Sequence, residues 1–167
     1  HAQRNNASNM KVRNVHRRLI SQPQTQVASL IATLASKNDQ VWPHENWPRM
    51  RLKDGLQIGS EGGHGPIRYR VTDYSPPHLI AFTFQQKGFI GAHLLETTSV
   101  NETHTEIKHI IEMRTEGLGT LSWLFAVRWL HDALIEDAFD KVENLLTGSH
   151  KRTPWSLWVR LLRKTLK

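Results

Sequence analysis

The chain has 167 residues, 38% of them apolar, and carries a formal net charge of +7 with a pI near 10.1. This length suits one domain with a sizeable core, and the spread of apolar residues along the chain excludes a disordered protein. No apolar run approaches the roughly 18 residues of a membrane-spanning helix. The absence of cysteine excludes disulfides, cysteine zinc sites and thiol nucleophiles. We therefore expect a globular protein located in the cytoplasm.

The N-terminal third of the chain predicts one strand and one helix. Residues 11–20 alternate loosely between polar and apolar side chains, as a half-buried strand does. The run SQPQTQVASLIATLAS then places Pro23 in the first turn of a short helix whose apolar residues recur every three or four positions. Two Trp-Pro pairs within residues 41–48 predict a short turn or a short helix rather than a long regular helix, because a residue before proline avoids the helical conformation.

The middle of the chain predicts an antiparallel meander of strands. Turn-forming residues occur in KDGL, SEGGHGP, YSPPH and SVNETH, and runs rich in apolar and β-branched residues lie between them. We interpret SEGGHGP as a flexible hairpin turn, since it lacks the lysine of a phosphate-binding loop. The predicted strands span residues 50–60, 66–74, 79–86, 88–99 and 104–114.

Two helices are predicted after Gly119. Residues 120–148 run without proline and end at Gly148, a residue type common at helix ends. The run WSLWVRLLRKTLK predicts a basic amphipathic helix with the apolar stripe Trp155, Trp158, Val159, Leu162 and Leu166, and with the cations Arg160, Arg163, Lys164 and Lys167 largely elsewhere. The chain is thus divided into an N-terminal tail (residues 1–10), a domain (11–148) and a basic C-terminal helix (149–167).

This order of elements predicts an α+β fold, in which an antiparallel sheet covers its apolar face with helices. In element order and in the segments QPQTQVASLIATL, VWPHENWPRM and GPIRYRVTDYSPPHLIAFTF, residues 11–147 resemble the START-like, helix-grip (SRPBCC) superfamily. The narrower similarity is to its polyketide cyclase/dehydrase-like branch. The resemblance implies a helix-grip fold, with a curved antiparallel sheet wrapped around a long C-terminal helix. It also implies a deep, mostly apolar cavity between them that binds hydrophobic molecules.

Side-chain alternation indicates which residues line that cavity. In the hairpin of residues 88–114, Glu96, Glu106 and Glu112 should face water, which turns the opposite set inward. His93 should then lie opposite His109 or one pair away. The predicted ligand-binding residues are Tyr69, Phe82, Phe84, Phe89, His93, Ile107, His109, Ile111, Val127, His131 and Leu134.

Several hypotheses account for the inward histidines. They are either core histidines with satisfied hydrogen bonds, or His93, His109 and Tyr69 bind the polar end of an apolar ligand. Zinc coordination is disfavoured because the spacing of His93, His109 and His131 matches no metal motif, so no metal and no cofactor are expected. General acid/base chemistry by one of the three imidazoles is chemically reasonable, but no catalytic signature requires it.

The favoured function is binding or transport of a hydrophobic small molecule or lipid between sheet and long helix. The alternative is a polyketide cyclase/dehydrase-like or hydrolase-like enzyme that uses the cavity histidines. The C-terminal helix leaves three alternatives: peripheral contact with an acidic membrane surface, packing on its own domain, and packing on a second copy in a homodimer. No nucleic-acid partner is expected, because the cations cluster at the chain ends without a platform of exposed aromatic residues.

Overall fold

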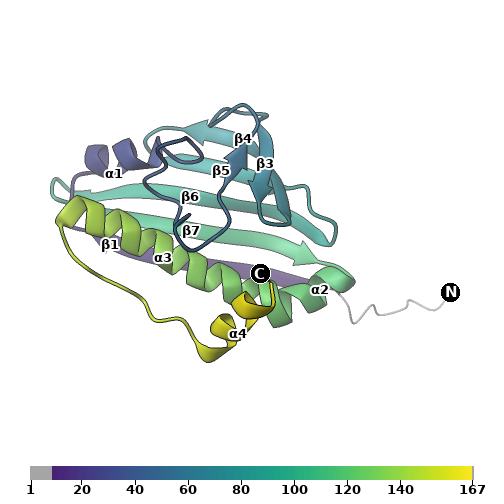
Figure 1. Ribbon diagram of the computed structural model, residues 1–167. Coiled ribbons are helices and arrows are strands. Elements are labelled where there is room, and N and C mark those ends of the chain that lie inside the picture. Colours follow the sequence, from purple (N-terminus) through teal and green to yellow (C-terminus); the bar gives the residue numbers. More distant parts are fainter. Residues whose placement is uncertain (1–8, 167) are drawn as a thin grey trace.

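The computed structural model describes residues 9–166, so residues 1–8 of the predicted tail and Lys167 lie outside the described residues (Figure 1). The strands are β1 (Met10–Ile20), β2 (Arg51–Leu52), β3 (Glu61–His64), β4 (Ile67–Ser75), β5 (Leu79–Phe84), β6 (Phe89–Asn101) and β7 (His104–Thr115). They form one antiparallel sheet in the order β1-β7-β6-β5-β4-β3-β2. The sheet curves around a long helix near the C-terminus, which confirms the predicted α+β class.

One predicted strand is wrong. In place of a strand over residues 50–60, the structure has the two-residue β2, then a loop, then β3. Gly55 and Gly59 in this loop have φ angles of 71° and 90°, which turn the chain out of the extended conformation that a strand needs. The segment SEGGHGP is also more ordered than expected, because it contains β3, which pairs with β4.

Helices cover one face of the sheet (Figure 1). They are α1 (Gln24–Ile31), α2 (Leu118–Ser122), one turn of π-helix η1 (Trp123–Val127), α3 (Arg128–Thr147) and α4 (Leu157–Thr165). The elements α2, η1 and α3 follow one another without a break, and Gly148 ends α3 in the left-handed conformation at φ 68°, as predicted. After a segment that runs back along α3, Ser156 caps the start of α4, and its side chain accepts a hydrogen bond from the backbone N–H of Val159.

Polar pairs join α3 to β1, the strand at one edge of the sheet. His16 and Arg18 lie two positions apart on one face of β1, and carboxylates recur every four residues on α3. The ring of His16 contacts Asp132 at 2.9 Å and Glu136 at 2.8 Å. Arg18 donates hydrogen bonds of 2.9 Å to both Glu136 and Asp140. These pairs hold the long helix over the first strand.

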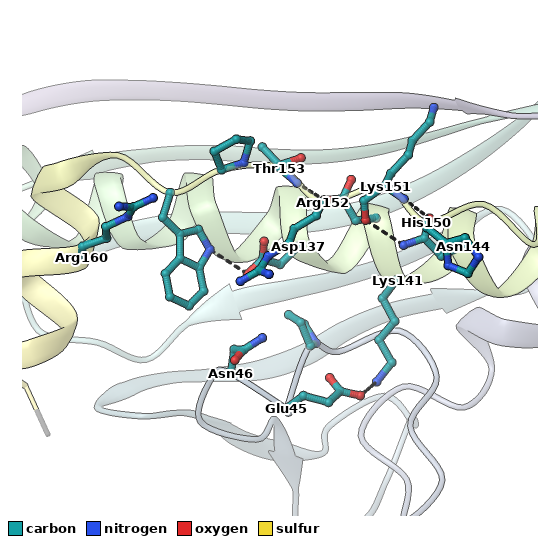
Figure 2. A pocket seen from close by; sticks show the side chains of 14 residues that line it. Glu45, Asn46, Asp137, Lys141, Asn144, His150, Lys151, Arg152, Thr153 and Arg160 are labelled. Atoms are coloured by element: carbon teal, nitrogen blue, oxygen red, sulfur yellow. Dashed lines mark hydrogen bonds and ion pairs between the residues drawn. The ribbon is translucent and has the colours of Figure 1, made fainter.

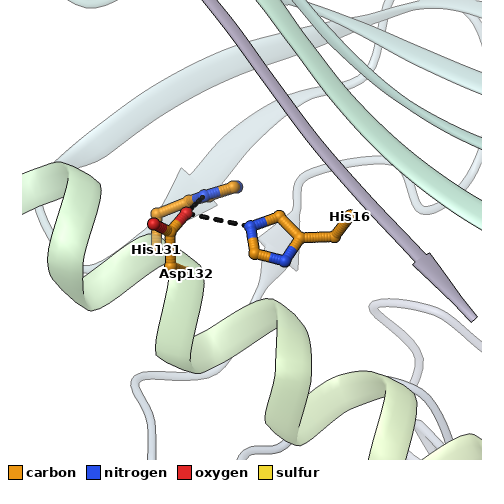
Figure 3. A group of neighbouring side chains, drawn as sticks. All are labelled: His16, His131 and Asp132. Atoms are coloured by element: carbon orange, nitrogen blue, oxygen red, sulfur yellow. Dashed lines mark hydrogen bonds and ion pairs between the residues drawn. The ribbon is translucent and has the colours of Figure 1, made fainter. Parts of the chain in front are cut away.

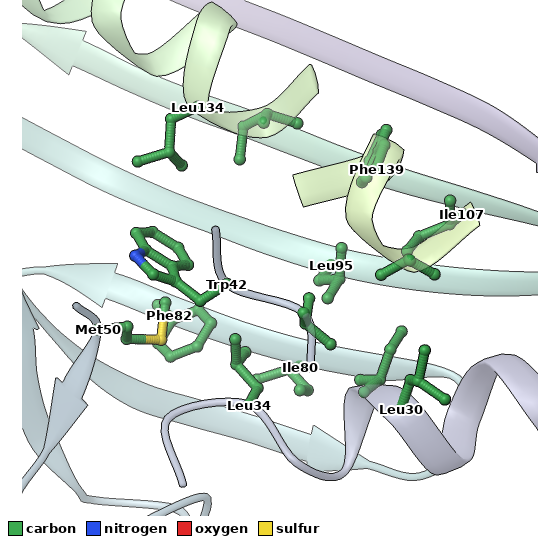
Figure 4. Packing of buried hydrophobic residues seen from close by; sticks show 14 of the residues in the cluster. Leu30, Leu34, Trp42, Met50, Ile80, Phe82, Leu95, Ile107, Leu134 and Phe139 are labelled. Atoms are coloured by element: carbon green, nitrogen blue, oxygen red, sulfur yellow. The ribbon is translucent and has the colours of Figure 1, made fainter. Parts of the chain in front are cut away.

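Two apolar clusters form the core. In the larger one, Trp42 and Met50 lie beside Phe82 of the sheet, with Leu134 of α3 opposite (Figure 4). The segment with the two Trp-Pro pairs therefore fills space between the sheet and the long helix. The smaller cluster consists of Phe89, Ile111, Met113 and Trp123, with partly buried neighbours that include Phe84 and Val127.

Candidate functional site

Aromatic rings from five strands and one helix form a continuous row under α3. In order, this histidine row consists of His64 (β3), Tyr69 (β4), His93 (β6), His109 (β7), His131 (α3) and His16 (β1). The distances between successive ring centroids are 5.6, 4.6, 5.5, 5.0 and 5.8 Å. The row crosses the sheet from one side to the other and includes all three histidines that the sequence placed inward.

Strand register brings the central members together. Ile111 is the partner of His93, and Leu95 is the partner of His109, so the two histidines lie one pair apart, as one of the two predicted arrangements has them. His16 is directly opposite His109 across β1 and β7. Side chains at such positions on one face of a sheet lie within contact distance.

His93 and His109 leave one donor and one acceptor free. Nδ1 of His93 and Nε2 of His109 lie 3.3 Å apart in a hydrogen bond. Burial lowers the pKa of both rings well below the ordinary histidine value, so each ring is neutral at neutral pH and carries one N–H. Whichever ring donates, Nε2 of His93 and Nδ1 of His109 are then one donor and one acceptor. Neither nitrogen has a hydrogen-bond partner among residues 9–166.

The other interior members of the row are also uncharged at neutral pH. Nδ1 of His64 and the hydroxyl of Tyr69 lie 2.8 Å apart in a hydrogen bond, so this hydroxyl is already engaged. Burial lowers the pKa of His64 to about 3 and raises that of Tyr69 well above its ordinary value. Burial also lowers the pKa of His131, although its hydrogen bond with Asp132 acts in the opposite direction.

The row ends in a charged group at His16. Burial alone would lower the pKa of His16, but hydrogen bonds with Asp132 and Glu136 raise it to about 9. The ligand atoms of His16, His131 and Asp132 lie within 4.8 Å of one another, a grouping that could hold a cation (Figure 3). Asp132 is, however, already engaged by His16 and by the Asn14 amide, each at 2.9 Å. We therefore interpret this group as an ion-pair network that fixes α3.

Solved structures share this arrangement of sheet and helix. Truncated norcoclaurine synthase from Thalictrum flavum superposes with a TM-score of 0.64 at 12% identity, covering 88% of this chain and 99% of that chain. The same enzyme in complex with dopamine and hydroxybenzaldehyde gives a TM-score of 0.64 at 11% identity, over 89% and 93% of the two chains. XoxI from Bacillus cereus gives 0.60 at 12% identity, over 84% and 99%. The chain has a START-like helix-grip fold.

No family model matches the sequence, and no curated protein matches it either. At 11% to 12% identity, these three structures show the helix-grip fold alone. The predicted resemblance to the START-like superfamily is therefore confirmed as a fold. The polyketide cyclase/dehydrase-like branch stays a prediction.

The predicted ligand-binding residues lie in the interior of the helix-grip domain, on both sides of the histidine row. His93 stacks on Phe82 at 4.7 Å between ring centroids and lies 5.0 Å from Phe84. Three of the predicted residues, Phe84, Val127 and His131, are partly buried. The buried ones are Tyr69, Phe82, Phe89, His93, Ile107, His109, Ile111 and Leu134. Tyr69, Phe82, Ile107 and Leu134 belong to the larger cluster, whereas Phe89 and Ile111 belong to the smaller one.

Sequence reasoning missed three members of the site: His16, His64 and Trp123. The ring centroid of Trp123 lies 6.3 Å from that of His131, so this buried side chain of η1 closes the row on the helix side. His16 shares its strand face with Asn14 and Arg18, and that polar face is a signal visible in the sequence. His64 had no such signal, because the glycines around it obscure the strand pattern.

The hollows of the helix-grip domain differ from the deep cavity that the resemblance implied. A hollow of about 20 Å³, room for about one water molecule, lies between α1 and the sheet. An open groove of about 950 Å³ lies between α3 and the terminal segment, and its lining includes several charged side chains, among which Lys141 donates to Glu45 at 2.7 Å (Figure 2). Neither hollow is lined by a member of the histidine row. His93 and His109 are buried against aromatic side chains, so a molecule that binds both rings displaces part of this packing.

Proposed function

We propose that the protein is a binding or carrier protein for a small, uncharged, mainly apolar molecule or lipid that carries a hydroxyl group. The hydroxyl is placed at His93 and His109, between the sheet and α3. The observation that carries this proposal is the free donor and free acceptor on these two buried rings. An unpaired buried polar group costs about 1–3 kcal/mol, and a hydroxyl, which both donates and accepts, can relieve that cost.

The surroundings of the two rings support an uncharged apolar ligand. Phe82 and Phe84 flank His93, and the two apolar clusters meet at the row. A charged ligand would lose its hydration among rings that are themselves neutral. Norcoclaurine synthase, which shares the fold, has been solved with dopamine and hydroxybenzaldehyde, two small aromatic molecules.

Trp123 is the side chain that the proposed ligand displaces. It is buried beside His131, whereas its neighbours in the chain, Leu124 and Phe125, are exposed. Outward movement of the η1 turn would therefore open a path from solvent to the histidine row. Ligand binding should change the fluorescence of Trp123, which a Trp123→Phe variant would identify.

The hydroxyl is tested with a matched pair of probes, naphthol and naphthalene. Isothermal titration calorimetry should show that the wild-type protein prefers naphthol by about tenfold, the value of one buried hydrogen bond. His93→Phe and His109→Phe should remove this preference while naphthalene affinity stays unchanged. The exposed His150 supplies the control, so His150→Phe should behave as wild type. Equal preference in all four proteins would refute the proposal, and native mass spectrometry of protein from its own host would identify the natural ligand.

A second candidate function is acid/base catalysis of a cyclase-like or hydrolase-like reaction. The observation in its favour is that His131 connects the neutral interior rings with the charged His16 through Asp132. Such a chain of titratable groups can deliver a proton to a bound substrate. Loss of turnover in His131→Gln with ligand affinity retained would favour this enzyme, whereas a bound molecule recovered unchanged from every variant favours the carrier.

A further inference from the structure

Apolar side chains are exposed along α2, η1 and α4. The exposed fractions are 81% for Leu118, 62% for Phe125 and 81% for Leu157. Isolated exposed apolar residues are ordinary, but a group of this kind on adjoining helices indicates an interaction surface. We call this group the docking surface; it consists of Leu118, Leu121, Leu124, Phe125, Trp129, Leu157, Trp158 and Leu161.

The two parts of the docking surface are joined. The indole N–H of Trp158 in α4 donates a hydrogen bond of 2.9 Å to the backbone carbonyl of Phe125 in η1. On its other face, α4 is fixed to the domain by the buried Val159 and by Arg163, whose guanidinium lies 4.7 Å from the Trp47 ring centroid. With that face anchored, Leu157 and Leu161 point away from the protein.

The charge of the docking surface indicates which kind of partner it binds. Residues 117–131 and 148–167, which supply it, contain no Asp or Glu. Arg128, Arg160 and Lys164 are exposed beside the apolar side chains, and Arg160 and Lys164 lie within one turn of Leu157 and Leu161 on the same side of α4. Tryptophan, leucine and cations without acidic residues are typical of helices that lie at an anionic membrane interface.

We propose that the docking surface binds peripherally to anionic phospholipid bilayers. The leucines and Phe125 insert at the headgroup boundary, and the cations contact lipid phosphates. None of the described helices is long and apolar enough to cross a membrane. This binding does not require a ligand at the histidine row, so it stands independently of the proposed function.

Cosedimentation with vesicles tests the proposal. The wild-type protein should sediment with vesicles of phosphatidylcholine and phosphatidylglycerol, should bind pure phosphatidylcholine much less, and should be released by high salt. Replacing both Leu157 and Leu161 by Asp should weaken binding by about tenfold or more, because two apolar side chains lose their burial in lipid. The Arg160→Gln, Lys164→Gln double variant keeps the apolar side chains and should lose the preference for anionic vesicles.

The matched control is Val100→Asp, at the opposite end of β6 from Phe89, where the side chain is 58% exposed. It should bind vesicles as the wild type does, and all variants should have unchanged circular dichroism. The proposal is overturned if the wild-type protein does not sediment with anionic vesicles. A second result would also overturn it. If analytical ultracentrifugation shows a dimer that dissociates when both leucines are replaced, and no variant binds vesicles, the surface binds a second copy of the chain.

Discussion

His16 carries a positive charge at a position where burial favours the neutral ring. Its two nitrogens contact Asp132 and Glu136, and Glu136 also accepts from Arg18. The charge is therefore compensated on both sides. Removing the ring would leave two partly buried carboxylates with fewer partners, a loss that exceeds that of an ordinary surface pair.

His16→Gln should lower the free energy of unfolding by about 2 kcal/mol, measured by urea denaturation. Arg13→Gln on the same strand is the control, because the Arg13 and Glu112 side chains that pair at 3.0 Å are 64% and 65% exposed. That substitution should cost less than about 0.5 kcal/mol. Equal losses in the two variants would contradict the role assigned to His16.

Periodicity located the C-terminal helix and part of its buried face. The predicted stripe included Val159 and Leu162, which turn inward, and Leu166, which is exposed. Leu157 and Leu161, outside that stripe, face away from the protein. Apolar residues occur on both sides of α4, so its own sequence cannot determine which side packs on the domain.

Two truncations distinguish the faces of α4. Val159→Ala should lower the free energy of unfolding by about 2 kcal/mol, because Val159 is buried. Leu157→Ala should leave stability within about 0.5 kcal/mol of wild type, because its side chain projects outward. If thermal denaturation shows the larger loss for Leu157→Ala, α4 packs by the opposite face.

Elements with one buried face were predictable in detail. The alternation in β6 and β7 turned His93 and His109 inward correctly, because shifting either strand by one residue would expose its whole apolar set. The hydrogen bond between Tyr69 and His64 was not predictable, since β3 has four residues and two of them are glycines. The contribution of Trp42 to the core was not predictable either, because a segment without regular structure has no period from which to infer its direction.

Across the whole molecule, two sets of histidines respond to pH in opposite directions. His64, His93, His109 and His131 have lowered pKa values in the folded state, so the folded protein loses stability as the pH falls below the unfolded value of about 6.5. The raised pKa of His16 stabilises the fold fully below about 6.5, and this contribution is lost as the pH rises to about 9. Stability should therefore be greatest near pH 7, where the unfolded histidines are mostly deprotonated and His16 is still charged in the folded state.

Urea denaturation at a series of pH values should show this maximum, with a steeper acid side because the four histidines with lowered pKa values act there and His16 alone acts on the alkaline side. Each group contributes up to about 1.4 kcal/mol per pH unit below the unfolded pKa. Replacing both His93 and His109 by Phe should make the acid side shallower and leave the alkaline side unchanged. Constant stability between about pH 5 and pH 7 would show that the buried rings take up protons in the folded state.

The turn of π-helix at Trp123–Val127 determines where the continuous helix of α2, η1 and α3 tolerates a change in length. Such a turn accommodates one surplus residue within a continuous helix. Deleting one residue between Arg128 and His131 would rotate the preceding side chains by about 100° and separate the exposed leucines of α2 from the inward face that carries His131. Deleting Leu124 would instead convert η1 into regular α-helix and preserve both faces. Within the continuous helix formed by α2, η1 and α3, length variation should therefore concentrate at η1, between the outward-facing leucines and the rings that face the sheet.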